Sequence, residues 1–263
     1  MNIKYLLGAI ISIPLLPIMY FQGKRIKKKI PQLPEAKGNE GHAACKEGSD
    51  ARLNIISLGE STIAGVGVET HEEGFTGTLA KELSNLLQAN ISWKVYAKSG
   101  YNARKVRQLL LPQIKEDKID LIVIGLGGND AFELNRPSAW RTQLVSLLEA
   151  IHRRFPETPI VFCNMPPIKL FPAFTPLIKF TIGNLVEILG QELESTADRF
   201  ENTFYFGEKI TFEEWSKRYD VETSEQNFFS DGVHPSKLTY QVWAKDVASN
   251  IFNNKELTAL LKN

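Results

Sequence analysis

Ser61, Asp231 and His234 are residue types that together can carry out acyl transfer. A serine hydroxyl is a poor nucleophile until a base removes its proton, and an imidazole can act as that base near neutral pH. A carboxylate is then needed to hold the other ring nitrogen and to stabilise the imidazolium. Asp231 precedes His234 by three residues and Gly232 allows a tight turn between them. We therefore assign Ser61 as nucleophile, His234 as base and Asp231 as the residue that orients the base.

Gly100 and Asn129 are the candidates for stabilising the oxyanion that such an attack creates. The backbone N–H groups of Ser61 and Gly100 and the side-chain amide of Asn129 would supply three hydrogen-bond donors. Glycine at position 100 lets the backbone approach closely. Each donor of this kind typically lowers the barrier by ~3–4 kcal/mol.

The elements that must position these residues follow from the hydrophobic pattern. Short apolar runs alternate with longer amphipathic ones from Leu53 onward, which predicts an α/β domain whose mostly parallel sheet has helices on both faces. Five strands are expected, at residues 53–58, 91–97, 119–126, 160–163 and 204–206. Helices are expected at residues 75–88, 103–114, 138–155, 185–200 and 235–252. Ligands of such sheets bind beyond the carboxyl ends of the strands, where the loops that carry the candidate residues can meet.

Four blocks of sequence stand in an order that resembles the SGNH, or GDSL, hydrolases, and the resemblance covers roughly residues 53–253. The blocks are Gly59-Glu60-Ser61, Gly100, Gly127-Gly128-Asn129-Asp130 and Asp231-x-x-His234-Pro235. The resemblance implies a flavodoxin-like three-layer α/β/α fold and metal-free, cofactor-free cleavage of acyl esters, thioesters or carbohydrate O-acetyl groups. It implies the same roles as the chemistry does. The aspartate that the family usually has before the serine is Glu60 here, which keeps the charge, has a longer reach and leaves the hydrogen bonding at that turn open.

Each block alone has an ordinary structural explanation. Ser61 can cap a helix, residues 127–130 and 231–232 can form turns, and His234 can cap the last helix. The four blocks together, in order and at one sheet edge, favour a serine hydrolase that acts on a lipid-type or small acyl ester. A sugar O-deacetylase or acyltransferase with the same site, and a scaffold that only retains the fold, are the alternatives.

Two further stretches bear on substrate binding. Residues 165–180 are rich in aromatic residues and proline and follow the fourth expected strand. They form either a lid or acyl-chain surface, with Phe171 and Phe174 as binding residues, or a loop packed on the core. His71 follows the serine loop and either lines the substrate entrance or lies in a solvated loop.

The N-terminal segment predicts contact with a membrane. Residues 5–21 carry no charge and, at ~1.5 Å per helical residue, span roughly 25 Å, near the lower limit for crossing a bilayer. We expect an uncleaved single-pass anchor in residues 1–23, a basic and polar tether in residues 24–52 and the hydrolase domain in residues 53–263. A cleaved signal peptide and a buried soluble helix are the alternatives. The basic cluster at 24–29 favours a cytoplasmic domain by the positive-inside rule, with the periplasmic or extracellular side left open.

Composition excludes other classes of function. The 31 basic and 30 acidic residues give a formal net charge of +1, so no basic field over the whole protein is available to bind nucleic acid. Cys45 and Cys163 are the two cysteines, too few for a disulfide framework or for the spacing of a Cys/His metal site. We therefore expect no metal and no cofactor, while the sequence leaves the oligomeric state open.

Overall fold

The centre of the molecule is a parallel sheet with one antiparallel edge. The computed structural model describes residues 3–208, 211–220 and 225–262, and in these residues the strand order is β1-β3-β2-β4-β5-β6. The strands are β1 (Glu40–Ala43), β2 (Arg52–Gly59), β3 (Asn90–Ala97), β4 (Leu121–Gly125), β5 (Ile160–Phe162) and β6 (Thr203–Tyr205). Strands β2 to β6 pair in parallel, and β1 pairs antiparallel with β3.

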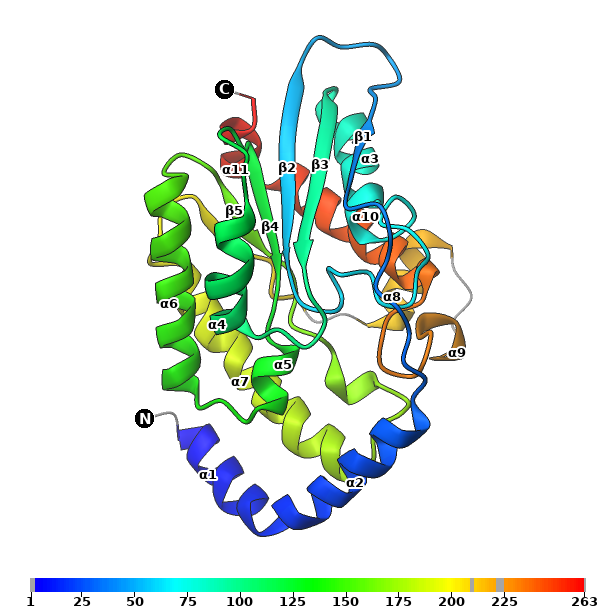
Figure 1. The fold of residues 1–263 in the computed structure, drawn as a ribbon, viewed down its shortest axis with the longest axis vertical. Coiled ribbons are helices and arrows are strands. Elements are labelled where there is room, and N and C mark those ends of the chain that lie inside the picture. The colour runs from blue at the N-terminus through cyan, green and yellow to red at the C-terminus, as the bar shows by residue number, and fades with distance from the viewer. Residues whose placement is uncertain (1–2, 209–210, 221–224, 263) are drawn as a thin grey trace.

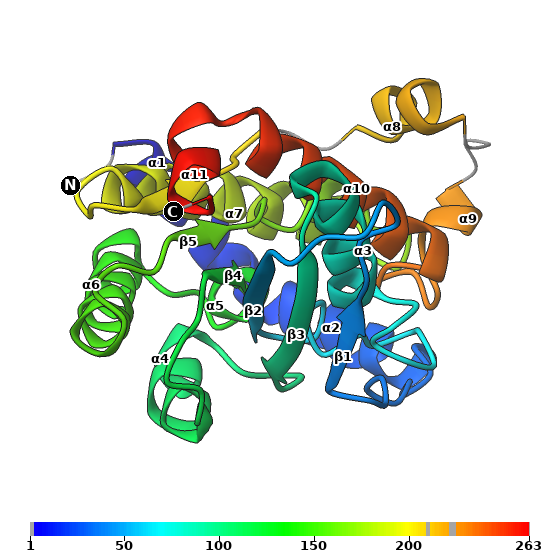
Figure 2. The ribbon, with the colours of Figure 1, turned by 90° about the horizontal axis from the view of Figure 1, so that it is seen from above.

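Helices cover both faces of this sheet. The longer ones are α1 (Ile3–Ser12), α2 (Leu16–Lys29), α3 (Phe75–Leu87), α6 (Pro137–Arg154), α7 (Pro176–Ala197), α8 (Phe212–Tyr219) and α10 (Lys237–Asn253). The shorter ones are α4 (Ala103–Lys105), α5 (Gly128–Phe132), α9 (Glu225–Phe228) and α11 (Lys255–Leu260). Figure 2 shows α3 and α10 on one side of the strands and α4 and α6 on the other. The predicted α/β class, with a mostly parallel sheet between two helical layers, is confirmed.

The side chains of the central strands alternate between the two faces of the sheet, and each face has its own cluster of buried hydrophobic residues. Ile55 of β2 packs in the cluster that contains α3 and α10, whereas the next residue, Ile56, packs in the cluster of α6 and α7. Leu121 and Ile122 of β4 divide in the same way. Successive side chains of a strand point to opposite faces, so an unbroken apolar run in the sequence produces a strand that is buried on both faces.

The prediction of five strands was wrong by one. Residues Glu40–Ala43 form the additional edge strand β1, in which His42 lies opposite Ser92 and Glu40 lies opposite Lys94. The ammonium of Lys94 lies 3.1 Å from the carboxylate of Glu40. An edge strand this short and polar has no apolar alternation, and charged side chains are typical of exposed sheet edges. The strand is stabilised by its pairing with β3, and the local sequence pattern does not predict that pairing.

The segment expected to be a tether packs on the domain instead. Helix α2 continues to Lys29, and the side chains of Ala36 and Cys45 are buried. The carboxylate of Glu35 accepts hydrogen bonds from the backbone N–H of Ser99, at 2.8 Å, and from Lys98, at 2.9 Å. These contacts hold part of the basic and polar segment 24–52 against the domain. The boundary placed at residue 53 stays a prediction.

Helix α7 is longer than expected. It begins at Pro176, with the Thr175 side chain accepting a hydrogen bond from the N–H of Ile178, whereas a start at residue 185 was predicted. Proline suits the first turn of a helix because it has no N–H to leave unpaired. The last five residues of the stretch 165–180 are therefore helix. The helix expected at 103–114 is α4 followed by a π-helical turn, Val106–Leu110, and a 3-10 turn that contains Pro112.

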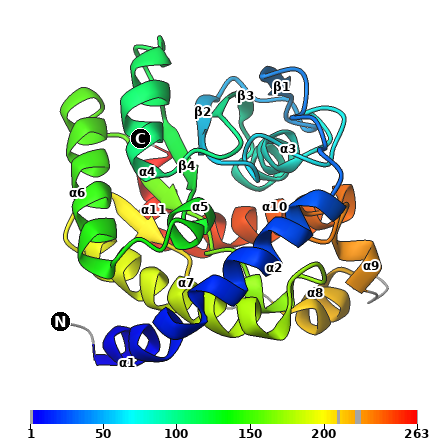
Figure 3. The same cartoon turned by 60° about the horizontal axis from the view of Figure 1, so that its bottom comes forward.

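The N-terminal helices curve beneath the sheet. A 3-10 turn at Ile13–Leu15, which contains Pro14, joins α1 to α2, and Figures 1 and 3 show the two helices passing below the carboxyl ends of the parallel strands. The run Ile3–Lys29 is long and apolar enough to cross a membrane, with a mean hydropathy of 1.7 over its most apolar 18 residues, and a signal sequence near an N-terminus has the same features. One side of the run contacts the core through Tyr5, Leu16, Met19 and Ile26.

Candidate active site

The candidate residues gather where the strand order reverses. Strand β2 has β3 on one side and β4 on the other, and ligands of such sheets bind in the crevice at this switch point. Ser61 follows β2, Gly100 follows β3 and Asn129 follows β4. The N–H of Glu60 donates to the carbonyl of Gly125 at 3.1 Å, which holds the first and third of these loops side by side.

Asp231 and His234 form a hydrogen-bonded pair. The Nδ1 atom of His234 lies 2.8 Å from one carboxylate oxygen of Asp231. The other oxygen accepts the backbone N–H groups of Val233, at 2.9 Å, and of His234, at 2.7 Å. Burial by itself would raise the pKa of Asp231, but the hydrogen bonds from His234 and from these N–H groups hold that pKa below its ordinary value. The carboxylate is therefore charged and aimed at the ring, as an orienting group must be.

The loop that carries Ser61 packs on the loop that carries His234. The Ser61 carbonyl accepts the N–H of Val66, and Gly67 has φ of +102°. A Cβ atom at Gly67 would lie 2.4 Å from the Ser230 hydroxyl and 3.0 Å from the Pro235 carbonyl, so the two loops meet at a position where only glycine fits. The hydroxyl of Ser61 makes no hydrogen bond to His234 here. In substrate-free sites such bonds are commonly long and tighten when substrate binds.

Glu60 has a defined structural role that the sequence left open. Its buried carboxylate accepts the backbone N–H groups of Gly128, at 2.8 Å, and of Asn129, at 2.9 Å, and the side-chain amide of Asn129, at 2.7 Å. It thereby caps the first turn of α5, where acidic groups are favoured. Burial nevertheless outweighs these bonds and raises the pKa of Glu60 to about 7. The longer side chain thus joins the serine loop to the Asn129 loop.

The three predicted oxyanion donors differ in their state. The backbone N–H groups of Ser61 and Gly100 donate to no other described residue, and Gly100 has the left-handed φ of +79° that favours glycine. Asn129 is different, because its amide donates both to Glu60 and, at 3.0 Å, to the carbonyl of Tyr101. A primary amide has two N–H donors. One of these two bonds must be released before Asn129 can donate to an oxyanion.

The predicted substrate-binding residues separate into three environments. Phe174 lines a groove beside His234 with a volume of about 880 Å³. Phe171 is buried, with its ring centroid 5.5 Å from that of Phe174, and lines a smaller cavity of about 60 Å³ near Glu60. His71 is not among the residues that line that groove, nor is it solvated: its side chain is buried, and burial lowers its pKa to about 4. Its ring faces the serine loop, since a Cβ atom added at Gly65 would lie 3.4 Å from the His71 ring.

Sequence reasoning did not find the wall that α2 contributes to this groove. The groove is lined by Leu16, Met19, Gly23, Ile26 and Ile30 of the N-terminal segment, which recur at the spacing of one helical face. That periodicity was readable, but residues 5–21 carry no charge and no polar face, so the sequence does not show which of their faces packs on protein. Within the residues that the structure describes, no three or more His, Cys, Asp or Glu side chains are grouped as a metal site requires.

Solved structures with a similar fold include proteins described as lipases and as members of a lipolytic protein family. TesA has a TM-score of 0.57 at 18% identity over 78% of this chain and 99% of its own. A member of the lipolytic protein G-D-S-L family from Veillonella parvula has a TM-score of 0.55 at 16% identity, over 77% and 99%. An extracellular lipase from Streptomyces rimosus has a TM-score of 0.52 at 15% identity, over 75% and 99%. At these identities the likeness shows the three-layer fold.

The sequence itself places the chain in a family. The model of the GDSL-like lipase/acylhydrolase family matches residues 57–242, which include all four blocks. The chain belongs to this family, and the resemblance read from the sequence is confirmed. Family membership implies hydrolysis of esters. No curated protein matches the chain.

Proposed function

We propose that the chain is a membrane-associated serine esterase that cleaves carboxylic acyl esters through an acyl-Ser61 intermediate. The observation that carries this proposal is the pair of Asp231 and His234, with a charged and fully enclosed carboxylate 2.8 Å from the imidazole, at the mouth of an apolar groove. Apolar walls with a few convergent polar groups are typical of sites for hydrophobic ligands.

In the proposed first half-reaction, Nε2 of His234 accepts the hydroxyl proton of Ser61 as its oxygen attacks the ester carbonyl. Asp231 stabilises the resulting imidazolium, and the carbonyl oxygen becomes the oxyanion. The N–H groups of Ser61 and Gly100 and the released amide of Asn129 donate to that oxyanion. As the C–O bond of the alcohol breaks, His234 returns the proton to the alcohol, which leaves with Ser61 acylated.

In the second half-reaction, water takes the place of the alcohol. His234 removes a proton from the water as the water oxygen attacks the acyl carbon, and it returns that proton to Ser61 when the acyl–Ser61 bond breaks. The products are the free acid and the free serine. All proton transfers are made by His234, so the reaction requires no metal or cofactor from the chain.

The test is turnover of p-nitrophenyl acetate and butyrate by the full chain. Wild type should release p-nitrophenol at a rate that Ser61→Ala lowers roughly 10³-fold or more, because the nucleophile is lost. A fluorophosphonate should label Ser61 in wild type and leave the variant unlabelled. Equal, slow turnover by the two proteins, with no labelling, would contradict the proposal. It would favour the alternative of a non-catalytic scaffold that only retains the fold. Activity confined to the acetyl ester would favour the sugar O-deacetylase instead.

The membrane part of the proposal rests on the run Ile3–Lys29. Its outer face exposes apolar side chains, among them Ile10 and Phe21, at 60% and 70%, a pattern that water does not favour and lipid does. The single-pass anchor and the cytoplasmic side stay predictions from the sequence.

A further inference from the structure

The groove beside His234 runs between two helices. One precedes the residues that match the family model, and the other lies within them. One wall is α2, which precedes residue 57, and the other is α7, which contributes Ile178 and Ile182. The site loops close one end through Val66, Ser99 and His234. The volume of about 880 Å³ lies within the range of about 300–1,000 Å³ found for small-molecule sites.

Contacts fix how α2 lies along α7. The hydroxyl of Thr175, the N-cap residue of α7, donates to the side-chain carbonyl of Gln22 at 2.7 Å. Met19 is 8% exposed and belongs to the same core cluster as Ile178 and Ile182. The C-terminal half of α2 therefore lies near the catalytic end of the groove, and its N-terminal half lies further along α7. Figure 3 shows α2 crossing in front of the sheet edge beside α7.

A second cavity continues the first. It has a volume of about 470 Å³ and runs along α1, with Gly8 and Ile11 on one side and Leu185 and Ile188 of α7 on the other. Four residues line both cavities: Leu16, Met19, Leu134 and Ile182. The two cavities thus form one apolar path that starts at His234 and follows α7 beneath the N-terminal helices.

We propose that this path, which we name the N-terminal groove, binds the acyl chain of a long-chain carboxylic ester. The N-terminal apolar segment is then one wall of the substrate site as well as a membrane element. The inference rests on the proposed esterase function for its reaction. Continuity with His234 identifies the occupant: the cavity beside Glu60 has a volume of only about 60 Å³, whereas the N-terminal groove is large enough for a long hydrocarbon tail. Each methylene that leaves water in the groove should raise kcat/KM about fourfold.

Charge along α2 orients the occupant in the groove. Lys24 and Lys27 line the first cavity in the half of α2 that lies near Ser99 and His234. The α1 side of the adjoining second cavity has one lysine, Lys4, at the start of the helix, and is otherwise lined by uncharged residues that include Leu7, Ala9 and Ile11. The polar end of an ester therefore lies among the lysines and the site loops, and its hydrocarbon tail extends toward α1.

Two glycines mark positions at which an added side chain would block the groove at different distances from His234. Gly23 lies in the middle of the lining face of α2, and Gly8 lines the second cavity. A Cβ atom at either position meets nothing within 4 Å, so a bulky side chain can be added without displacing the core. Ile18 is on the outer face at 50% exposure and lines neither cavity, which makes Ile18→Trp the matched control for added bulk.

The experiment measures kcat/KM for p-nitrophenyl esters from acetyl to hexadecanoyl. It uses the full chain in a steroid-based detergent, which has no linear alkyl tail to occupy the groove. Gly23→Trp should lower the ratio of hexadecanoyl to acetyl kcat/KM at least tenfold, since several methylenes lose their contacts. Gly8→Trp should lower kcat/KM for the hexadecanoyl ester alone. Its ratio of octanoyl to acetyl kcat/KM should stay at the wild-type value. Ile18→Trp should keep both ratios.

A binding measurement separates this inference from the proposed function. A fluorescent fatty acid of 16 carbons should bind to wild type, Ser61→Ala and Ile18→Trp, and at least tenfold more weakly to Gly23→Trp. Equal binding of the probe to all four proteins, or chain-length ratios that no variant changes, would overturn the groove as the acyl site. If instead wild type hydrolyses no ester yet binds the probe in the groove-dependent way, the esterase proposal fails and the lipid-binding groove stands.

Discussion

At the scale of single residues, the serine turn and the asparagine turn are joined through one carboxylate. Glu60 holds two backbone N–H groups and the side-chain amide of Asn129, so the residue that precedes the proposed nucleophile also positions a proposed oxyanion donor. The neighbouring Asp130 is buried and accepts the N–H of Ala103 at 3.0 Å. Burial raises the pKa of Asp130 to about 6.

Glu60 should make the stability of the fold depend on pH. Its folded-state pKa of about 7 lies above the ordinary value of 4.5, so the folded chain binds the proton more tightly than the unfolded chain does. This contribution is complete below pH 4.5 and is lost as pH rises through 7, with a total of roughly 3 kcal/mol. In Glu60→Gln the free energy of unfolding should fall less between pH 5 and 8, with the remaining slope due to groups such as Asp130.

Chemical denaturation at pH 5, 6, 7 and 8 measures this difference in slope. The exposed Glu47→Gln substitution removes a charge away from the site and should keep the slope of wild type. Identical slopes in wild type and Glu60→Gln would contradict a titrating Glu60.

Asp231→Asn should separate catalysis from folding. The asparagine carbonyl can still accept the N–H groups of Val233 and His234, so the loop keeps its backbone contacts. Its NH₂ group, however, would face Nδ1 of His234 and favour the tautomer with the proton on Nε2, which cannot accept the proton of Ser61. We expect kcat for a short acyl ester to fall roughly 10³- to 10⁴-fold with an unchanged unfolding midpoint. A variant that retains more than a tenth of wild-type kcat would remove Asp231 from the proposed mechanism.

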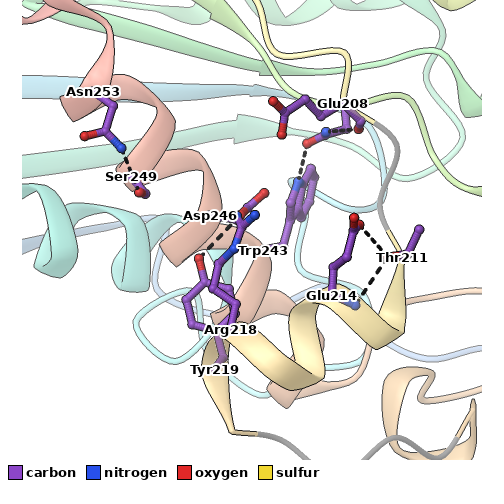
Figure 4. Close-up of polar contacts among 10 residues, drawn as sticks. Glu208, Thr211, Glu214, Arg218, Tyr219, Trp243, Asp246, Ser249 and Asn253 are labelled. Atoms are coloured by element: carbon purple, nitrogen blue, oxygen red, sulfur yellow. Dashed lines mark hydrogen bonds and ion pairs between the residues drawn. The ribbon is translucent and has the colours of Figure 1, made fainter.

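At the scale of elements, helix α8 is attached to α10 by a partly enclosed ion pair. Figure 4 shows Arg218 of α8 directed at Asp246 of α10, with the Tyr219 hydroxyl also donating to that carboxylate. The carboxylate of Asp246 is nearly buried, whereas the guanidinium is about half exposed. Thr211 caps the start of α8 by accepting the N–H of Glu214. In a second contact, the ring N–H of Trp243 of α10 donates to the side-chain carbonyl of Asn164.

Arg218→Ala should destabilise the protein because it leaves a nearly buried carboxylate without its cation. We expect a loss of about 1–3 kcal/mol in the free energy of unfolding. Adding Asp246→Asn should restore part of that loss, since the double variant no longer contains the unpaired charge. Urea unfolding of the two single variants and the double variant measures the coupling, and strictly additive losses would show that the pair contributes nothing.

Elements differ in how far the sequence predicts them. The buried strands and helices α3, α6 and α10 follow from local apolar periodicity, which fixes both their type and their inner face. Strand β1 and the N-terminal half of α7 do not, because the first is stabilised by pairing with β3 and the second begins inside a proline-rich stretch that reads as loop. The four sequence blocks of the site could be identified from the sequence. The hydrogen bonds between Glu60 and Asn129 and the groove wall formed by α2 could not, because both are contacts between segments far apart in the chain.

At the scale of the whole molecule, the N-terminal helices have two different faces. The inner face packs on α7 and lines the groove, while the outer face exposes apolar side chains to the surroundings. Among the exposed apolar residues of the run, Ile3, Ile10, Ile18 and Phe21 line neither cavity. The basic residues of the last turn of α2, Lys27, Lys28 and Lys29, then lie where a membrane surface with anionic headgroups would attract them.

The outer face should hold the protein on membranes without taking part in the fold. Ile10 and Ile18 are 60% and 50% exposed and line neither cavity, so Ile10→Asp/Ile18→Asp leaves the inner contacts in place. Each aspartate near the middle of a membrane helix costs about 2.5–3.5 kcal/mol. Together they should move the full chain from the floating vesicle fraction to the bottom of the gradient in a flotation assay with lipid vesicles, while acetyl-ester turnover stays at the wild-type level. Leu86→Asp/Leu109→Asp adds the same charges at two exposed apolar positions of the domain and should float like wild type. A double variant of the N-terminal helices that still floats with the vesicles would mean that another surface of the molecule attaches it to lipid.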